Sequence, residues 1–156
     1  MPDASAASAA QVTPKAVQNP LTLIMKIKSP ADYAQLSGLL HQVQSAPSDK
    51  NPVWLALNAL KVVHFARFVF LENNTKIAVI TTYDGSFDEY INDFIDALGG
   101  VFNAILMHVD GAPPLPVETN RDAFLAYVRE NDLRGIEPFY SAYPKATVLD
   151  ILSALE

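Results

Sequence analysis

Cysteine is absent from the chain, which excludes disulfide bonds and thiolate metal sites and leaves the redox compartment open. Basic residues are scarce, because 11 Lys and Arg stand against 17 Asp and Glu and the formal net charge is -6. A nucleic-acid backbone or an anionic membrane surface usually requires a basic patch, so we expect neither as a partner. No apolar run approaches the roughly 18 residues of a membrane-spanning helix.

The common catalytic and nucleotide-binding motifs are missing as well. The sequence contains no GxGxxG, GxxxxGK(S/T), GxSxG or HExxH pattern. The usual signatures of dinucleotide and P-loop sites, serine hydrolases and zinc peptidases are therefore absent. The sequence alone names no reaction and leaves open whether the protein is an enzyme.

The first residues, MPDASAASAAQVTPKAVQNP, are rich in Ala, Ser, Gln and Pro and have no apolar segment behind a basic one. This composition does not fit a secretory signal, so we expect a cytoplasmic protein in which residues 1–19 form a disordered arm. Ordered structure is expected to begin at Leu21. Residues 20–156 suit a single domain, because a chain with 50% hydrophobic residues can fill one sizeable core.

Residues 62–100 are the part of the sequence whose secondary structure is easiest to predict. Apolar residues alternate on both sides of Asn73 and Asn74, which predicts two antiparallel strands joined by a two-residue turn. The register that follows places His64 opposite Tyr83. Both faces of this hairpin are substantially apolar, so we expect a second layer to cover the face that helices leave bare.

Periodicity and capping residues predict the other elements. In order, these are a strand at 21–28, a helix capped by Ser29 and ending near Ser45, a short helix at 51–60, a helix from Ser86 to Gly99-Gly100, a helical turn within 101–110, a helix opened by Thr119 and Asp122, a strand at 137–144, and a helix capped by Thr147 and Asp150.

This order is that of an α+β protein and resembles the ferredoxin-like split βαβ fold of the dimeric α+β barrel superfamily. The resemblance covers roughly Leu21 to Tyr143, and HFARF followed by YDGSFDEYINDF is similar to uncharacterised members. It implies a four-stranded antiparallel sheet, with extra helices before and after the last strand. It also implies a homodimer that buries the bare sheet faces against each other, but it assigns no catalytic residue.

Two histidines are candidates for chemistry. His64, facing Tyr83, is a candidate general base or an axial ligand for haem or another metal; the alternative is a hydrogen-bonded core residue. Asp84, at a predicted strand end, is a candidate ligand-binding residue. His108, two residues before Asp110, is a candidate ligand-binding or metal-ligating residue; the alternative is a helix-end contact. Tyr83 is a candidate hydroxyl donor, with packing as the alternative.

Arg67 is the most informative charge, because it lies between Phe65 and Val69 on a predicted buried face. A buried guanidinium requires a carboxylate or an anionic ligand. If Lys26 shares that face, the two cations line a pocket for a small anionic or aromatic ligand. The alternative is an ion pair across the dimer interface.

Three functions are consistent with these residues. One is a small-molecule-binding or oxidoreductase-like module, cofactor-free or haem-binding, that uses Arg67, Lys26 and His64. The second is a non-catalytic structural or interaction domain whose dimer surface is its function. The third is a ligand-sensing regulator, although the sequence shows no DNA-binding segment.

Overall fold

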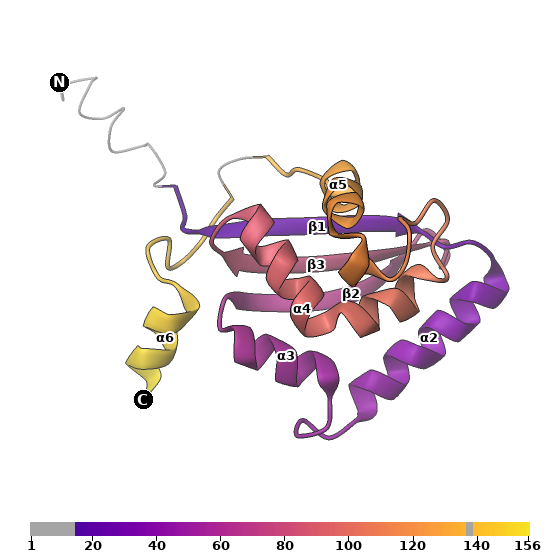
Figure 1. Cartoon of the computed structure of the whole chain (residues 1–156). Coiled ribbons are helices and arrows are strands. Elements are labelled where there is room, and N and C mark those ends of the chain that lie inside the picture. Colours follow the sequence, from indigo (N-terminus) through magenta and orange to yellow (C-terminus); the bar gives the residue numbers. More distant parts are fainter. Residues whose placement is uncertain (1–14, 137–138) are drawn as a thin grey trace.

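The computed structural model describes residues 15–136 and 139–156, which form an α+β arrangement (Figure 1). The elements in chain order are β1 (Gln18–Lys26), α2 (Pro30–Ser45), α3 (Pro52–Leu60), β2 (Val63–Leu71), β3 (Lys76–Asp84), α4 (Phe87–Leu106), the 3₁₀ helix η1 (Val117–Thr119), α5 (Arg121–Asn131) and α6 (Val148–Leu155). β1 begins three residues before the predicted Leu21. Most of the predicted arm, residues 1–14, lies outside the described residues.

The sheet has three antiparallel strands in the order β1-β3-β2, so the predicted four-stranded ferredoxin-like sheet is wrong. The expected last strand was placed at 137–144. Residues 139–144 are irregular, and residues 137–138 lie outside the described part. Pro144 offers no N–H to a ladder. The carbonyl groups of Tyr143 and Ala146 accept hydrogen bonds from the Gln18 side chain instead of pairing with a strand.

Directly after α5, the chain contacts the free edge of β1. Leu23 forms an isolated antiparallel bridge with Asp132. The Leu133 N–H donates to the Thr22 carbonyl at 2.8 Å, and the Thr22 N–H donates to the Asp132 carboxylate at 2.9 Å. This short contact occupies the edge without extending the sheet.

The hairpin register is as predicted from Phe65, opposite Thr82, to Leu71, opposite Lys76. A β-bulge then places Val63, and not His64, opposite Tyr83. The predicted pairing of His64 with Tyr83 is therefore wrong, because a bulge inserts one extra residue and turns a side chain in a new direction.

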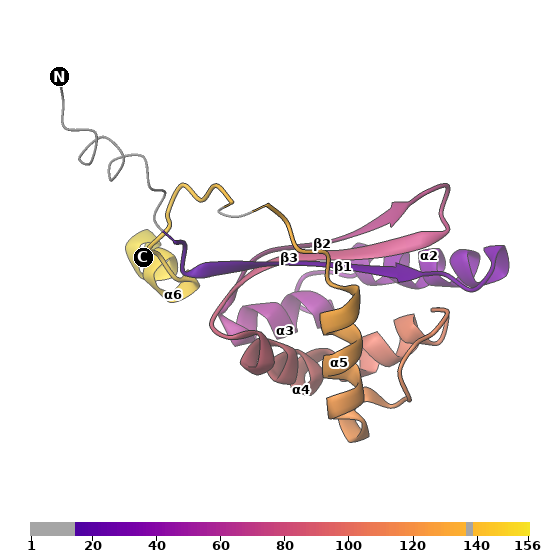
Figure 2. The same ribbon diagram turned by 90° about the horizontal axis from the view of Figure 1, so that it is seen from above.

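Helices α3, α4 and α5 lie on one face of the sheet, and none of the described helices covers the opposite face (Figure 2). Alternate residues of β1 and β3 bury their side chains beneath these helices. An aromatic series runs through the core, with successive ring centroids 4.0 to 5.9 Å apart: Tyr83, Tyr90, Phe94, Phe102 and Phe124. On the bare face Phe65 keeps 77% of its surface exposed.

Three of the predicted helix starts carry the expected cap. The side chains of Ser29, Ser86 and Thr147 accept hydrogen bonds from the backbone N–H three residues later, and Thr147 forms a complete capping box with Asp150. The helix predicted to open at Thr119 instead begins at Arg121, after Asn120, and no side chain caps it.

The predicted end of α4 at Gly99-Gly100 is wrong, because the helix continues to Leu106. A Cβ atom at Gly99 would lie 2.7 Å from Oε1 of Glu118, so glycine here permits the close approach of η1. Asn103 joins the same contact by donating to Glu118 at 2.8 Å. In the described part of the chain, α4 and the other helices are too short or too polar to span a membrane.

Candidate functional site

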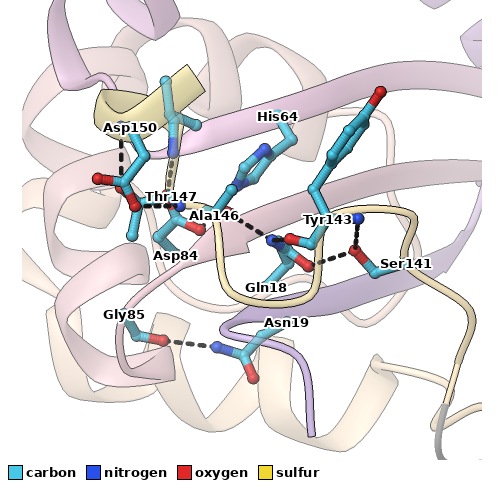
Figure 3. A network of polar contacts seen from close by, with 11 residues as sticks. Gln18, Asn19, His64, Asp84, Gly85, Ser141, Tyr143, Ala146, Thr147 and Asp150 are labelled. Atoms are coloured by element: carbon cyan, nitrogen blue, oxygen red, sulfur yellow. Dashed lines mark hydrogen bonds and ion pairs between the residues drawn. The ribbon is translucent and has the colours of Figure 1, made fainter. Parts of the chain in front are cut away.

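His64 and Asp84 form a buried pair at the end of the hairpin (Figure 3). Nε2 of the imidazole lies 2.7 Å from Oδ1 of the carboxylate, and the two side chains are only 8% and 11% exposed. The β-bulge after Val63 brings them together, since it turns His64 away from Tyr83. Both residues were candidates in the sequence, but strict alternation assigned His64 to the face of Tyr83.

Asp84 also holds the last helix. Its second oxygen, Oδ2, accepts a hydrogen bond of 2.8 Å from the N–H of Val148, the first residue of α6. A carboxylate is favoured at a helix N-terminus, where backbone donors are free. One carboxylate therefore connects the imidazole of His64 to α6.

Residues 139–146, here called the strap, are fastened to β1 by Gln18. The Gln18 amide donates to the carbonyl groups of Tyr143 at 2.8 Å and Ala146 at 2.6 Å, and it accepts from the Ser141 hydroxyl at 2.7 Å. Only 5% of Gln18 is exposed. Sequence reasoning missed Gln18, which it assigned to the disordered arm. No local signal marks this residue, because its partners are more than 120 positions away.

A cavity of about 580 Å³ lies between the strap and the start of β2, and we call it the strap cavity. Its walls come from β1, the end of α3, the start of β2, β3, the strap and α6: Gln18, Leu57, Asn58, Lys61, Val63, His64, Phe65, Thr82, Phe139, Tyr140, Ser141, Ala142, Tyr143, Val148, Ile151 and Leu152. Apolar and aromatic side chains predominate. The volume falls within the range of roughly 300–1,000 Å³ that is usual for small-molecule sites.

Tyr83 does not belong to this cavity. Its side chain is 4% exposed and stacks on Tyr90, with ring centroids 4.0 Å apart beneath the helices. Burial, together with the charge of Asp132, raises the pKa of the Tyr83 hydroxyl. Tyr83 therefore packs in the core, which was the alternative to a role as a hydroxyl donor.

Arg67 and Lys26 do not converge. Arg67 is exposed, so the prediction that it is buried and requires an anion is wrong. Arg67 aligns with Ile80, and Ile80 aligns with Thr22, four residues from Lys26 along β1. That separation is roughly 13 Å along the strand at about 3.3 Å per residue. Lys26 instead lies 3.6 Å from Asp110, on an exposed surface.

His108 lies near the end of α4 and contacts the start of α2. Its Nδ1 is 2.9 Å from Oδ1 of Asp32, whose other oxygen accepts from the Ser29 hydroxyl at 2.5 Å. Hydrogen bonds from Ser29 and then His108 hold the pKa of Asp32 below its usual value. The pair joins two helix ends and does not line the strap cavity.

The described residues give no support to a metal or haem site. No three His, Asp or Glu side chains gather among them in a way that would hold a metal ion. Nε2 of His64 is engaged by Asp84, so iron ligation through that nitrogen requires this pair to open. We therefore derive no chemistry through haem.

Comparison of the chain with protein-family models, curated proteins and solved structures finds no match in any of the three. The three-stranded α+β arrangement does not by itself identify a superfamily, so the resemblance to dimeric α+β barrels remains a prediction. The strap cavity and the pair of His64 and Asp84 beside it are the observations that bear on function.

Proposed function

We propose that this protein binds a small, mainly apolar or aromatic molecule in the strap cavity. The observation that carries the proposal is the combination of apolar walls with the buried pair of His64 and Asp84 at one side. Small-molecule sites typically join a large apolar surface to a few fixed polar groups. Here the apolar walls would supply most of the binding free energy and the imidazole would orient the ligand.

Binding is favoured over catalysis by the hydrogen bonds of the cavity wall. Asp84 orients His64 as it would orient a general base, but the Ser141 hydroxyl donates to Gln18 and not to the imidazole. An activated nucleophile needs a hydrogen bond to its base. The geometry therefore resembles a recognition site with one oriented imidazole.

The solvatochromic dye Nile red, a neutral and mainly apolar molecule, provides a direct test. We expect a blue-shifted and enhanced emission on saturable binding. Ala142→Trp should fill the cavity, because Ala142 lines it, and weaken binding about tenfold or more. Ala126→Trp, at an exposed position on α5, is the matched control and should not alter binding.

The two variants separate the cavity from unspecific adsorption. Circular dichroism should first confirm that both variants are folded. Failure of the unmodified protein to bind the dye, or equal binding by Ala142→Trp and Ala126→Trp, contradicts the proposal.

A second proposal is that two copies pair through the helix-free face of the sheet. Phe65, which also lines the strap cavity, is 77% exposed there, and Val69 and Ile80 are only partly covered. Exposed apolar surface of this kind is often an association site. Sedimentation equilibrium should show a dimer that Val69→Lys dissociates, whereas a stable monomer at micromolar concentration contradicts this proposal.

A further inference from the structure

The described side chains that line the strap cavity include one cation and no carboxylate. Among these described residues, Lys61 carries the only formal charge at neutral pH apart from any charge on His64. This contrasts with a chain whose net charge is -6. A cation beside an apolar cavity favours a ligand with a negatively charged end.

We infer that the ligand is amphipathic, with an apolar or aromatic body and one anionic group, and that Lys61 binds this group. The inference rests on the proposed function, since it concerns the occupant of the same cavity. The apolar body would contact the strap and α6, and the anionic end would lie at the end of α3.

Local backbone geometry places Lys61 at this position. It is the C-cap of α3, with φ 53° and ψ 35°, and its N–H donates to the Leu57 carbonyl at 3.3 Å. A lysine is favoured there because free carbonyl groups make a helix C-terminus partly negative. The residue is exposed, so its ammonium group stays hydrated in the free protein and can turn toward a ligand when one binds.

Asn58 adds a neutral donor beside Lys61. The two residues are three positions apart, Asn58 in the last turn of α3 and Lys61 at its C-cap, and both line the cavity. A carboxylate can accept hydrogen bonds from an ammonium and an amide together. This pairing favours a carboxylate or a similar oxyanion over a halide.

The nearest buried carboxylate does not oppose this assignment. Asp84 stands behind His64 and does not line the cavity, and its two oxygens accept from Nε2 of His64 and the Val148 N–H. Donors that satisfy both oxygens reduce the field that the carboxylate projects into the cavity.

Three naphthalene derivatives of nearly the same shape test the inference by isothermal titration calorimetry. These are naphthalene carboxylate, naphthalene carboxamide and naphthylmethylammonium. We expect the carboxylate to bind roughly three- to tenfold more tightly than the carboxamide, and the ammonium compound to bind most weakly. High salt should reduce the advantage of the carboxylate.

Lys61→Gln should abolish the preference for the carboxylate over the carboxamide. Lys50→Gln, at an exposed position outside the cavity, is the matched control and should keep the preference. Equal affinities of carboxylate and carboxamide, or a preference that survives Lys61→Gln, overturn the inference but not the proposed function. Absence of Nile red binding and of binding by all three compounds overturns both.

Discussion

Asp84 binds His64 and the first residue of α6 with the two oxygens of a single carboxylate. The contact to Nε2 of His64 is 2.7 Å and the hydrogen bond from the Val148 N–H is 2.8 Å. The end of the hairpin, one wall of the strap cavity and the last helix therefore depend on one side chain. A substitution of Asp84 should alter the structure at all three of these places.

Asp84→Asn should lower the free energy of unfolding by about 1–3 kcal/mol. The amide keeps one acceptor oxygen, so it cannot accept hydrogen bonds from both the Nε2–H of His64 and the Val148 N–H at a site that is only 11% exposed. Urea denaturation measures the change. Asp93→Asn, at an exposed position on α4, is the control and should be neutral. An equal effect of both substitutions would show that Asp84 has no special role.

Gln18→Leu should release the strap while leaving the core folded. Three hydrogen bonds join the Gln18 side chain to Ser141, Tyr143 and Ala146, and each contributes about 1 kcal/mol. Amide hydrogen exchange in residues 139–156 should accelerate on the order of tenfold or more, whereas α4 should keep its protection.

Gln35→Leu, at an exposed position on α2, serves as the control for Gln18→Leu. Unchanged exchange in the strap of the Gln18 variant would refute the fastening role. Uniformly faster exchange throughout the protein would also do so, because it would indicate global and not local destabilisation.

Gly100→Ala should stabilise the protein by about 0.5–1 kcal/mol, because alanine is the better helix former and a Cβ at this position meets nothing within 4 Å. Gly99→Ala should gain less. Its Cβ would displace the Glu118 side chain and disturb the hydrogen bond from Asn103. Thermal unfolding of the two variants makes the comparison. Equal gains would contradict the close approach of η1 to α4.

Asp32→Asn should weaken the acid dependence of stability. The folded-state pKa of Asp32 is lowered from 3.8 by hydrogen bonds from Ser29 and His108. Its contribution is therefore complete above 3.8 and declines as the pH falls from 3.8 through the lowered folded-state pKa. Urea midpoints should differ between wild type and variant at neutral pH and converge in strong acid.

The control for this acid series is Asp49→Asn, at an exposed position in the loop before α3. It should track the wild type throughout. A constant difference between Asp32→Asn and wild type down to strong acid would mean that the carboxylate charge is not what stabilises the contact.

Local rules predicted much of the secondary structure correctly. Ser29, Ser86 and Thr147 begin their helices where expected, because capping depends on residues within one turn. The hairpin register from Phe65 to Leu71 also follows from alternation. The end of α4 was wrong, because the reason for Gly99 is the distant Glu118 and not helix termination.

The candidate site was predicted only in part. His64 and Asp84 were both selected, but their pairing depends on a bulge that alternation does not reveal. Arg67 was selected because its face of the sheet was predicted to be buried, but Arg67 is exposed. Lys61 and Gln18 were missed. Lys61 is notable only because it lines a cavity, and Gln18 only because of hydrogen-bond partners far along the chain.

By itself, the sequence determined the α+β class, most of the helix starts and the hairpin, because each depends on contacts between near neighbours. Tertiary structure alone decided that the last segment is a strap and not a fourth strand. The reason is that Gln18 satisfies the carbonyl group of Tyr143, which a strand at 137–144 could have used in a ladder. The same long-range contacts enclose the strap cavity, in which we propose that a ligand binds.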